Sequence, residues 1–306
     1  MSNAPHLPVL LKTIITALQP KPAGRYIDGT LGAGGHSASI LEECAPDGEI
    51  LGLDLDPQAL ALAQERLAIF GKRVHIIQTS YLMMKIEAEK LGWNTVDGIL
   101  LDFGVSSMQL DTPERGFSFL HDGPLDMRFS PEASQSAADL VNTLPEDEIA
   151  AIIFQYGEDR LSRKIARIIV NNRPIHTTKD LADLILKYIG KKERIHPATR
   201  TFQALRIAVN NELESIETVI PLAVSLLKPA GRLAIISFHS LEDRLVKEYF
   251  RRESTDCICP PRQPVCTCSH RASIKEINRK PIEADETEKQ ANSRARSAKL
   301  RIAEKL

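Results

Sequence analysis

Residues 25–36, RYIDGTLGAGGH, decide the fold class of this 306-residue chain. The apolar residues before Asp28 predict a buried strand, and the glycines after it predict a sharp turn into a helix. Glycines at such a turn permit a positive φ and let a ligand approach the backbone closely. An ordinary tight turn has the same composition, so the glycines alone do not identify a binding site. Asp28 narrows the choice of ligand, because a carboxylate there would repel the pyrophosphate of a dinucleotide.

Strands and helices alternate around this turn. Buried strands are predicted at 25–28, 49–54, 74–77, 96–102 and, after a long interval, 232–237. Segments with helical periodicity separate the early strands, as at 57–70 and 81–91. Such alternation is typical of a parallel sheet with right-handed crossovers, so we expect an α/β, doubly wound, Rossmann-like sheet.

The interval between the fourth and fifth strands has a helical pattern. Amphipathic helices are predicted at 146–156, 161–171, 178–189 and 199–212, with no convincing strand between them. We therefore expect residues 1–110 and 212–306 to form one sheet domain. Residues 111–211 are expected to form an inserted all-helical domain.

Charge is distributed unevenly along the chain. The 39 Lys and Arg nearly balance 40 Asp and Glu, which excludes a uniformly basic nucleic-acid-coating protein and a strongly acidic disordered one. Residues 160–210 nevertheless hold 12 basic against 3 acidic residues, a net +9, whereas residues 1–60 hold 3 against 7, a net −4. The basic segment is either a solvated helix face or a surface that contacts phosphates.

Acidic residues end three of the predicted strands: Asp28, Asp54 and Asp102. Asp54 follows Gly32 by 22 positions, the approximate spacing at which a carboxylate reaches ribose hydroxyls. Tyr81, after the third strand, is placed to stack on an adenine. Together with the acid ahead of the glycines, these residues predict a site for S-adenosylmethionine, which carries an ammonium and a sulfonium. A nicotinamide-dependent oxidoreductase is the main rival, and Asp28 argues against it.

The segment after the fourth strand, 102–109, is expected to face the reacting groups, because ligands of an open parallel sheet bind outside the carboxyl ends of its strands. Methylation at cytosine C5 generally needs a cysteine nucleophile, and this segment contains none. An exocyclic amine instead needs hydrogen-bond acceptors that position it. We predict that Asp102 and Ser106 are these acceptors; Asp102 contacting only the cofactor is the other interpretation.

The chain resembles the ribosomal RNA small-subunit methyltransferase H family. The matching motifs lie at 28–30, 34–36, 102–107, 109–111, 115–119, 123–128, 196–204, 237–244 and 294–301. The resemblance implies a sheet domain with a helical insertion that recognises RNA. It also implies methylation of N4 of a cytidine in the decoding centre of 16S rRNA, with S-adenosylmethionine as the methyl donor. The substrate would be the 30S subunit or a late precursor, although naked rRNA stays open.

The resemblance also assigns roles to individual residues. Its implied cofactor contacts are Gly34, Gly35, His36, Asp54, Tyr81, Asp102 and Gln109. Its implied RNA contacts are Arg200, Arg206, His239 and Arg244. For His239 the alternative is that the side chain only caps the helix that follows.

Four of the five cysteines lie within the segment 256–270, at positions 257, 259, 266 and 268. Cys257, Cys259, Cys266 and Cys268 have the close spacing of a tetrahedral zinc site; reduced thiols or a disulfide are the alternatives. Some members of the family lack these cysteines, so catalysis does not generally depend on them. Cys44 is expected to be a core residue.

The first twenty residues do not resemble a secretory signal, and no segment has the length of a membrane span. We therefore expect a cytoplasmic protein with no membrane partner, and a homodimer is one candidate for its oligomeric state. Two other functions are considered. A DNA exocyclic-amine methyltransferase would carry paired prolines and an aromatic residue after Asp102, which are absent here. A non-catalytic rRNA-binding assembly factor would not need an intact cofactor site.

Overall fold

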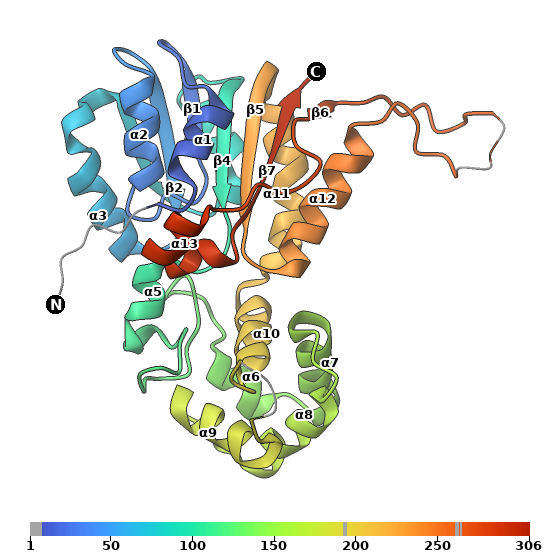
Figure 1. The fold of residues 1–306 in the computed structure, drawn as a ribbon. Helices are drawn as coiled ribbons and strands as arrows, with labels where there is room; N and C mark the ends of the chain where they lie inside the picture. Colours follow the sequence, from blue (N-terminus) through green and yellow to red (C-terminus); the bar gives the residue numbers. More distant parts are fainter. Residues whose placement is uncertain (1–7, 192–194, 261–262, 264) are drawn as a thin grey trace. The chain divides into compact units, whose positions relative to one another are not determined.

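The computed structural model describes residues 8–191, 195–260, 263 and 265–306. The chain divides into two compact units (Figure 1). The sheet unit comprises the residues up to Gly104 together with Leu213–Leu306, and the helical unit comprises Val105–Glu212. The helical unit begins at 105 instead of the predicted 111, because Val105 already packs in the same core as Phe117.

The sheet unit contains a seven-stranded sheet with the order β3-β2-β1-β4-β5-β7-β6. The strands are β1 (Arg25–Asp28), β2 (Glu49–Asp54), β3 (Val74–Gln78), β4 (Val96–Asp102), β5 (Leu227–Ser237), β6 (Ile274–Glu276) and β7 (Lys299–Lys305). The first five are parallel, as predicted. The two C-terminal strands were not predicted, and both pair antiparallel, so the sheet is mixed.

Helices cover both faces of this sheet (Figure 1). They are α1 (Leu11–Leu18), α2 (Gly35–Glu43), α3 (Pro57–Leu67), α4 (Met84–Lys90), α11 (Glu212–Leu226) and α12 (Ser240–Glu253). Successive strand residues alternate between the two cores: Tyr26 packs in the core with α1 to α3, and Ile27 packs in the core with α4, α11 and α12. Burial on both faces explains why these strands read as continuous apolar runs.

The helical unit contains α5 (Ser107–Asp111), α6 (Ala137–Thr143), α7 (Glu146–Gly157), α8 (Ser162–Asn171), α9 (Thr178–Ile189) and α10 (Thr199–Asn210). The four helices predicted here correspond to α7 to α10. Helix α8 shows why the pattern was readable: Ile165 and Ile169 are fully buried in the unit's core, and Arg163 and Arg167 are exposed. This apolar face, rather than helix propensity alone, stabilises the helix.

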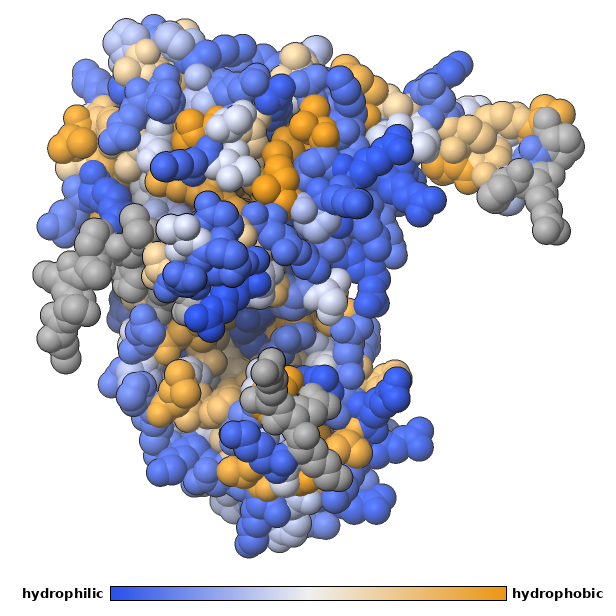
Figure 2. Space-filling model, in the orientation of Figure 1, coloured by the Kyte–Doolittle hydropathy of each residue, from blue (hydrophilic) through white to orange (hydrophobic). Residues whose placement is uncertain are grey.

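Hydrophilic residues dominate the face of the molecule drawn in Figure 2. Among the residues that the structure describes, no helix combines the length and the apolar character needed to cross a bilayer.

Candidate active site

The order of the strands reverses between β1 and β4, and ligands of doubly wound sheets bind outside the carboxyl ends of the strands at this point. Asp28 ends β1 and Asp102 ends β4. The turn after β1 is tied to β4, because the Gly29 N–H donates to the carbonyl of Leu100 at 3.0 Å. The hydroxyl of Thr30 accepts a hydrogen bond from the Asp102 N–H at 2.7 Å. The glycine turn and Asp102 are therefore held together as one local structure.

Asp28 holds the turn from inside the protein. Its side chain is 1% exposed, and its two oxygens accept hydrogen bonds from the hydroxyl of Ser37 at 2.7 Å and from the Thr30 N–H at 3.2 Å. Burial raises the pKa of Asp28 to about 6. From the sequence alone, this carboxylate was expected to select the charge of the ligand. The structure gives Asp28 a structural role as well, because one oxygen is bonded within the turn and the other joins the turn to α2.

Asp54 lies beside an open turn, as its predicted role requires. One carboxylate oxygen accepts from the Gly32 N–H at 2.8 Å and the other from the Asp56 N–H at 2.9 Å. A carboxylate has further lone pairs, so Asp54 can also accept from the two hydroxyls of a ribose. Among the described residues, a Cβ on Gly32 would meet one atom within 4 Å, the carbonyl oxygen of Thr30 at 3.9 Å. The absence of a side chain at Gly32 thus leaves room for a ligand next to Asp54.

Gly34 is the N-cap of α2, and its N–H donates to the carbonyl of Leu31 at 2.8 Å. Gly35 and His36 begin the helix, where backbone N–H groups lack helical partners and can bind an anionic group. Gly34 has a φ of 75°, which favours glycine. A Cβ on Gly35 would lie 2.4 Å from Cγ of Pro8, so this glycine is required by close packing of the chain itself. The His36 ring is 7% exposed and its Nε2 lies 2.9 Å from the carbonyl oxygen of Val9. Burial lowers the pKa of His36, which favours a neutral ring that donates this bond.

Tyr81 starts a short 3₁₀ helix, Tyr81–Met83, after β3. Its ring centroid lies 6.0 Å from that of Phe103. A Cβ on Gly29 would lie 3.1 Å from the Tyr81 Cβ, so the tyrosine is close to the glycine turn. This position is compatible with the predicted stacking on an adenine.

Asp102 has an unused acceptor. Its Oδ1 is buried and has no hydrogen-bond partner among the described residues. Burial raises the pKa of Asp102 to about 6; the positive charge of Arg294 opposes this shift and the negative charge of Glu242 adds to it. A buried acceptor without a partner is costly, so a ligand N–H at this position would be stabilised. The roles of Arg294 and Glu242 were missed, although both lie in motifs that carry the family resemblance.

His239 is the N-cap of α12, and its Nδ1 accepts from the Glu242 N–H at 3.4 Å. Its Nε2 lies 3.1 Å from Oε1 of Glu242, a side chain that is fully buried. The other oxygen of Glu242 accepts from the Phe238 N–H at 2.7 Å. These contacts favour the capping interpretation of His239 over the predicted RNA contact.

Ser106 and Gln109 lie in the helical unit and form a capping box at the start of α5. The Ser106 hydroxyl accepts from the Gln109 N–H at 3.1 Å, and the Gln109 side-chain oxygen accepts from the Ser106 N–H at 3.0 Å. Both side chains therefore stabilise a helix end. The structure thus gives Ser106 and Gln109 a capping role, and their predicted contacts to the substrate amine and to the cofactor stay predictions.

The predicted RNA-contacting arginines have different surroundings. Arg206 donates two hydrogen bonds to the carboxylate of Glu212, at 2.7 and 2.9 Å, and its side chain is only 16% exposed. A largely buried bidentate pair favours a structural role for Arg206. Arg200 is half-buried in the first turn of α10, and Arg244 is exposed on α12.

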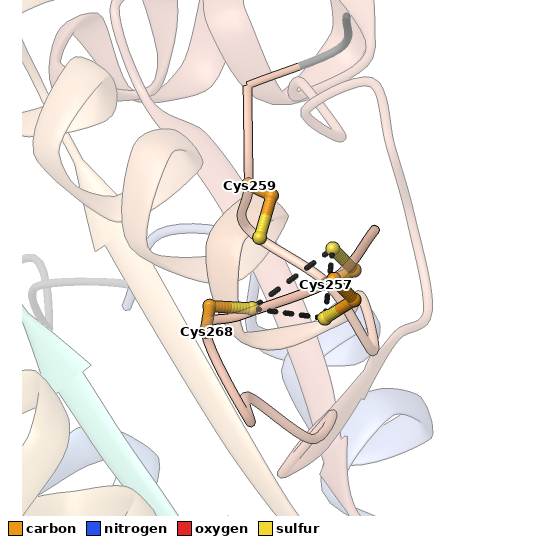
Figure 3. Close-up of side chains that lie close together, drawn as sticks. Cys257, Cys259 and Cys268 are labelled. Atoms are coloured by element: carbon orange, nitrogen blue, oxygen red, sulfur yellow. Dashed lines mark hydrogen bonds between the residues drawn. The ribbon is translucent and has the colours of Figure 1, made fainter. Parts of the chain in front are cut away.

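The four clustered cysteines converge, as Figure 3 shows for three of them. The sulfurs of Cys257, Cys259, Cys266 and Cys268 all lie within 4.8 Å of one another. Cys44 is fully buried in a hydrophobic core, as predicted.

The strand order and the switch point between β1 and β4 define the class of fold: the chain has a doubly wound, Rossmann-like α/β sheet. Residues 3–306 match the model of the MraW methylase family. The chain belongs to this family.

Relatives of the chain are similar over most or all of their length. The protein named "Ribosomal RNA small subunit methyltransferase H" of Citrifermentans bemidjiense is 52% identical over 312 residues, covering 100% of both chains. Proteins of the same name from Dehalococcoides mccartyi and Heliobacterium mobile are each 50% identical. They cover 100% and 98% of this chain, and 88% and 99% of their own lengths. The crystal structure of an rRNA methylase from Streptococcus thermophilus covers 99% of each chain with a TM-score of 0.44 and 11% identity, too distant to support an argument about function.

Proposed function

We propose that this chain transfers the methyl group of S-adenosylmethionine to N4 of a cytidine in the decoding centre of 16S rRNA. The observation that carries the chemistry is the buried, unpartnered Oδ1 of Asp102 at the switch point of the sheet. The names of the full-length relatives support the choice of small-subunit rRNA. The resemblance of the motifs to the methyltransferase H family supports N4 of cytidine.

The residues around the glycine turn fit S-adenosylmethionine. Asp54 has lone pairs left for the ribose hydroxyls, and Gly32 leaves space beside it. Tyr81 offers a ring for the adenine, and the N-terminus of α2, which begins at Gly35, offers N–H groups for the carboxylate. When bound there, the cofactor supplies an electrophilic methyl group.

Asp102 acts on the amine. The N4 lone pair is delocalised into the cytosine ring, and an acceptor on one N–H holds the amine in the orientation needed for in-line attack. Asp102 supplies this acceptor through Oδ1. Its pKa of about 6 also places the carboxylate within range to receive the proton that the methylated amine loses.

The helical unit is proposed to contact the phosphates of the RNA. Exposed basic side chains on it include Arg160, Arg163, Lys179 and Lys187. Arg200 and Arg244 are the candidates for contacts to the RNA in this proposal, because the hydrogen bonds of Arg206 and His239 favour structural roles for those two residues. The substrate in this proposal is the 30S subunit or a late precursor in the cytoplasm. Sedimentation analysis of the purified chain distinguishes a monomer from a homodimer.

The test is methyl transfer from labelled S-adenosylmethionine to three substrates: 30S subunits that lack the modification, naked 16S rRNA, and DNA. Digestion and nucleoside mass spectrometry should find N4-methylcytidine in 16S rRNA. Label recovered as 5-methylcytidine, or only in DNA, would refute the proposal. The non-catalytic alternative is tested by calorimetry, because an assembly factor without a cofactor would show no heat of S-adenosylmethionine binding.

A further inference from the structure

We propose that Cys257, Cys259, Cys266 and Cys268 bind one zinc ion in a structural site. The site lies in the segment 254–273, which connects α12 to β6 at the edge of the sheet unit (Figure 1). It is separate from the residues assigned to methyl transfer, and the proposal does not depend on them.

The distances between the sulfurs match a tetrahedral site. The Cys257 and Cys266 sulfurs are 3.5 Å apart, those of Cys266 and Cys268 are 3.6 Å apart, and those of Cys257 and Cys268 are 3.9 Å apart (Figure 3). A zinc ion with Zn–S bonds of about 2.3 Å places its four sulfurs about 3.8 Å from one another. The cysteines therefore already have the spacing that the ion requires.

Disulfide pairing does not account for this arrangement. A disulfide joins one sulfur to one partner at about 2.05 Å. The Cys257 sulfur instead has two neighbours at similar distances, Cys266 and Cys268. A group of three or more sulfurs at one common spacing is expected for ligands that surround a shared centre.

Backbone N–H groups donate to two of the sulfurs in a reciprocal pattern. Ile258, between the first two cysteines, donates to the Cys268 sulfur at 3.4 Å. Thr267, between the last two, donates to the Cys259 sulfur at 3.4 Å. Such bonds stabilise negative charge on thiolate ligands. Four thiolates this close would repel one another strongly without a cation.

None of the described residues of this segment is buried. Ile258 is 47% exposed and Val265 is 69% exposed, and Figure 2 shows hydrophobic side chains uncovered on this projection. Its base is tied by the Ser273 N–H, which donates to the carbonyl of Glu253 at 2.9 Å. A segment without a hydrophobic core depends on a cross-link or a metal for its order. Zinc binding would supply that free energy directly.

Tetrahedral sites of four thiolates also suit iron, so metal analysis decides the identity. The full-length chain, purified under reducing conditions and dialysed against a weak chelator, should retain about one zinc per chain. Cys259→Ser and Cys268→Ser should each lower the zinc content at least about tenfold. Cys44→Ala is the matched control, because it removes a thiol outside the cluster, and it should keep the metal.

Two further measurements do not depend on activity. Cobalt added to the metal-free chain should give the visible absorption of a tetrahedral thiolate complex, and zinc should displace it. Chelation should accelerate proteolysis within 254–273 about tenfold while leaving the sheet unit intact. The proposal is overturned by a wild-type chain without bound metal and without the cobalt spectrum, by iron in place of zinc, or by disulfides in the anaerobically prepared protein.

Discussion

At the scale of single residues, Asp102 carries the proposed chemistry. Asp102→Asn replaces one carboxylate oxygen by an NH₂ group, which donates instead of accepting, and removes the negative charge that can take up a proton. We expect kcat for methyl transfer to fall at least about 100-fold, the lower range for loss of a general base. The control is Glu43→Gln, the same change at an exposed position at the end of α2. Turnover of Asp102→Asn near that of the control would contradict the assigned role.

The raised pKa of Asp102 also predicts how stability depends on pH. Because burial raises this pKa from 3.8 to about 6, the folded chain binds more protons than the unfolded chain between these values. The contribution of Asp102 to stability is therefore greatest below about pH 4 and declines, by up to about 3 kcal/mol, as the pH rises to about 6. Asp102→Asn removes this decline. The unfolding free energy of the variant minus that of the wild type should therefore increase between about pH 4 and pH 6. Urea titrations of both proteins at pH 4 and pH 7 measure their unfolding free energies. If the difference between variant and wild type is the same at both pH values, the pKa assignment is contradicted.

Asp54 is predicted to control cofactor affinity. The two carboxylate oxygens of Asp54 accept from the Gly32 and Asp56 N–H groups and, in our proposal, from the ribose hydroxyls. Asp54→Asn replaces one of these oxygens by an NH₂ group, which cannot accept a hydrogen bond. We expect the Kd for S-adenosylmethionine to rise about tenfold, as for the loss of one hydrogen bond to a charged group. Calorimetry provides the measurement. Asp47→Asn, at an exposed loop where the carboxylate accepts from the Ala23 N–H, is the matched control, and equal affinities of both variants would remove Asp54 from the site.

At the scale of elements, variants of His239 at the start of α12 distinguish a capping role of this residue from a role in RNA binding. His239→Ala removes the cap and should lower the unfolding free energy by about 1 kcal/mol, whereas His239→Asn preserves a capping side chain and should be close to the wild type. If capping is its role, His239→Asn should also bind 30S subunits with unchanged affinity. Urea unfolding and a filter-binding assay test the two expectations. A stable His239→Asn variant with weakened RNA binding would restore the RNA contact.

Whole elements differed in how well the sequence predicted them. The central strands are covered on both faces, so apolar runs such as 96–102 marked them clearly. Strand β7 alternates charged and apolar residues at the C-terminal end, and β6 has only three residues, so neither gave a strong signal. Strand β7 pairs with β5, which begins more than sixty residues before it, and β6 pairs in turn with β7.

At the scale of the whole molecule, the basic segment of the helical unit is predicted to set RNA affinity. The paired change Arg163→Gln with Lys179→Gln removes two exposed positive charges of this unit. We expect weaker 30S binding and a log–log salt dependence whose slope is shallower by about 0.7 for each phosphate that is no longer neutralised. Affinity for S-adenosylmethionine should stay the same.

The control for this pair is Lys85→Gln with Lys247→Gln, which removes two exposed charges from the sheet unit. Binding titrations at several salt concentrations compare the two pairs. Equal losses of affinity from both pairs would indicate a general effect of net charge and contradict a phosphate-contacting role for the helical unit.

The sequence by itself determined the doubly wound sheet, the helical insertion and the acids at the strand ends, because each depends on local periodicity and on residues adjacent in the chain. Tertiary structure decided what each side chain does. It turned Asp28 inward to Ser37 and engaged Arg206 with Glu212. It also placed the charges of Glu242 and Arg294 close enough to Asp102 to change the pKa of its carboxyl group. Burial and hydrogen-bond partners arise only when distant segments pack together, and they set the pKa of a carboxylate and the acceptors it has left for a ligand.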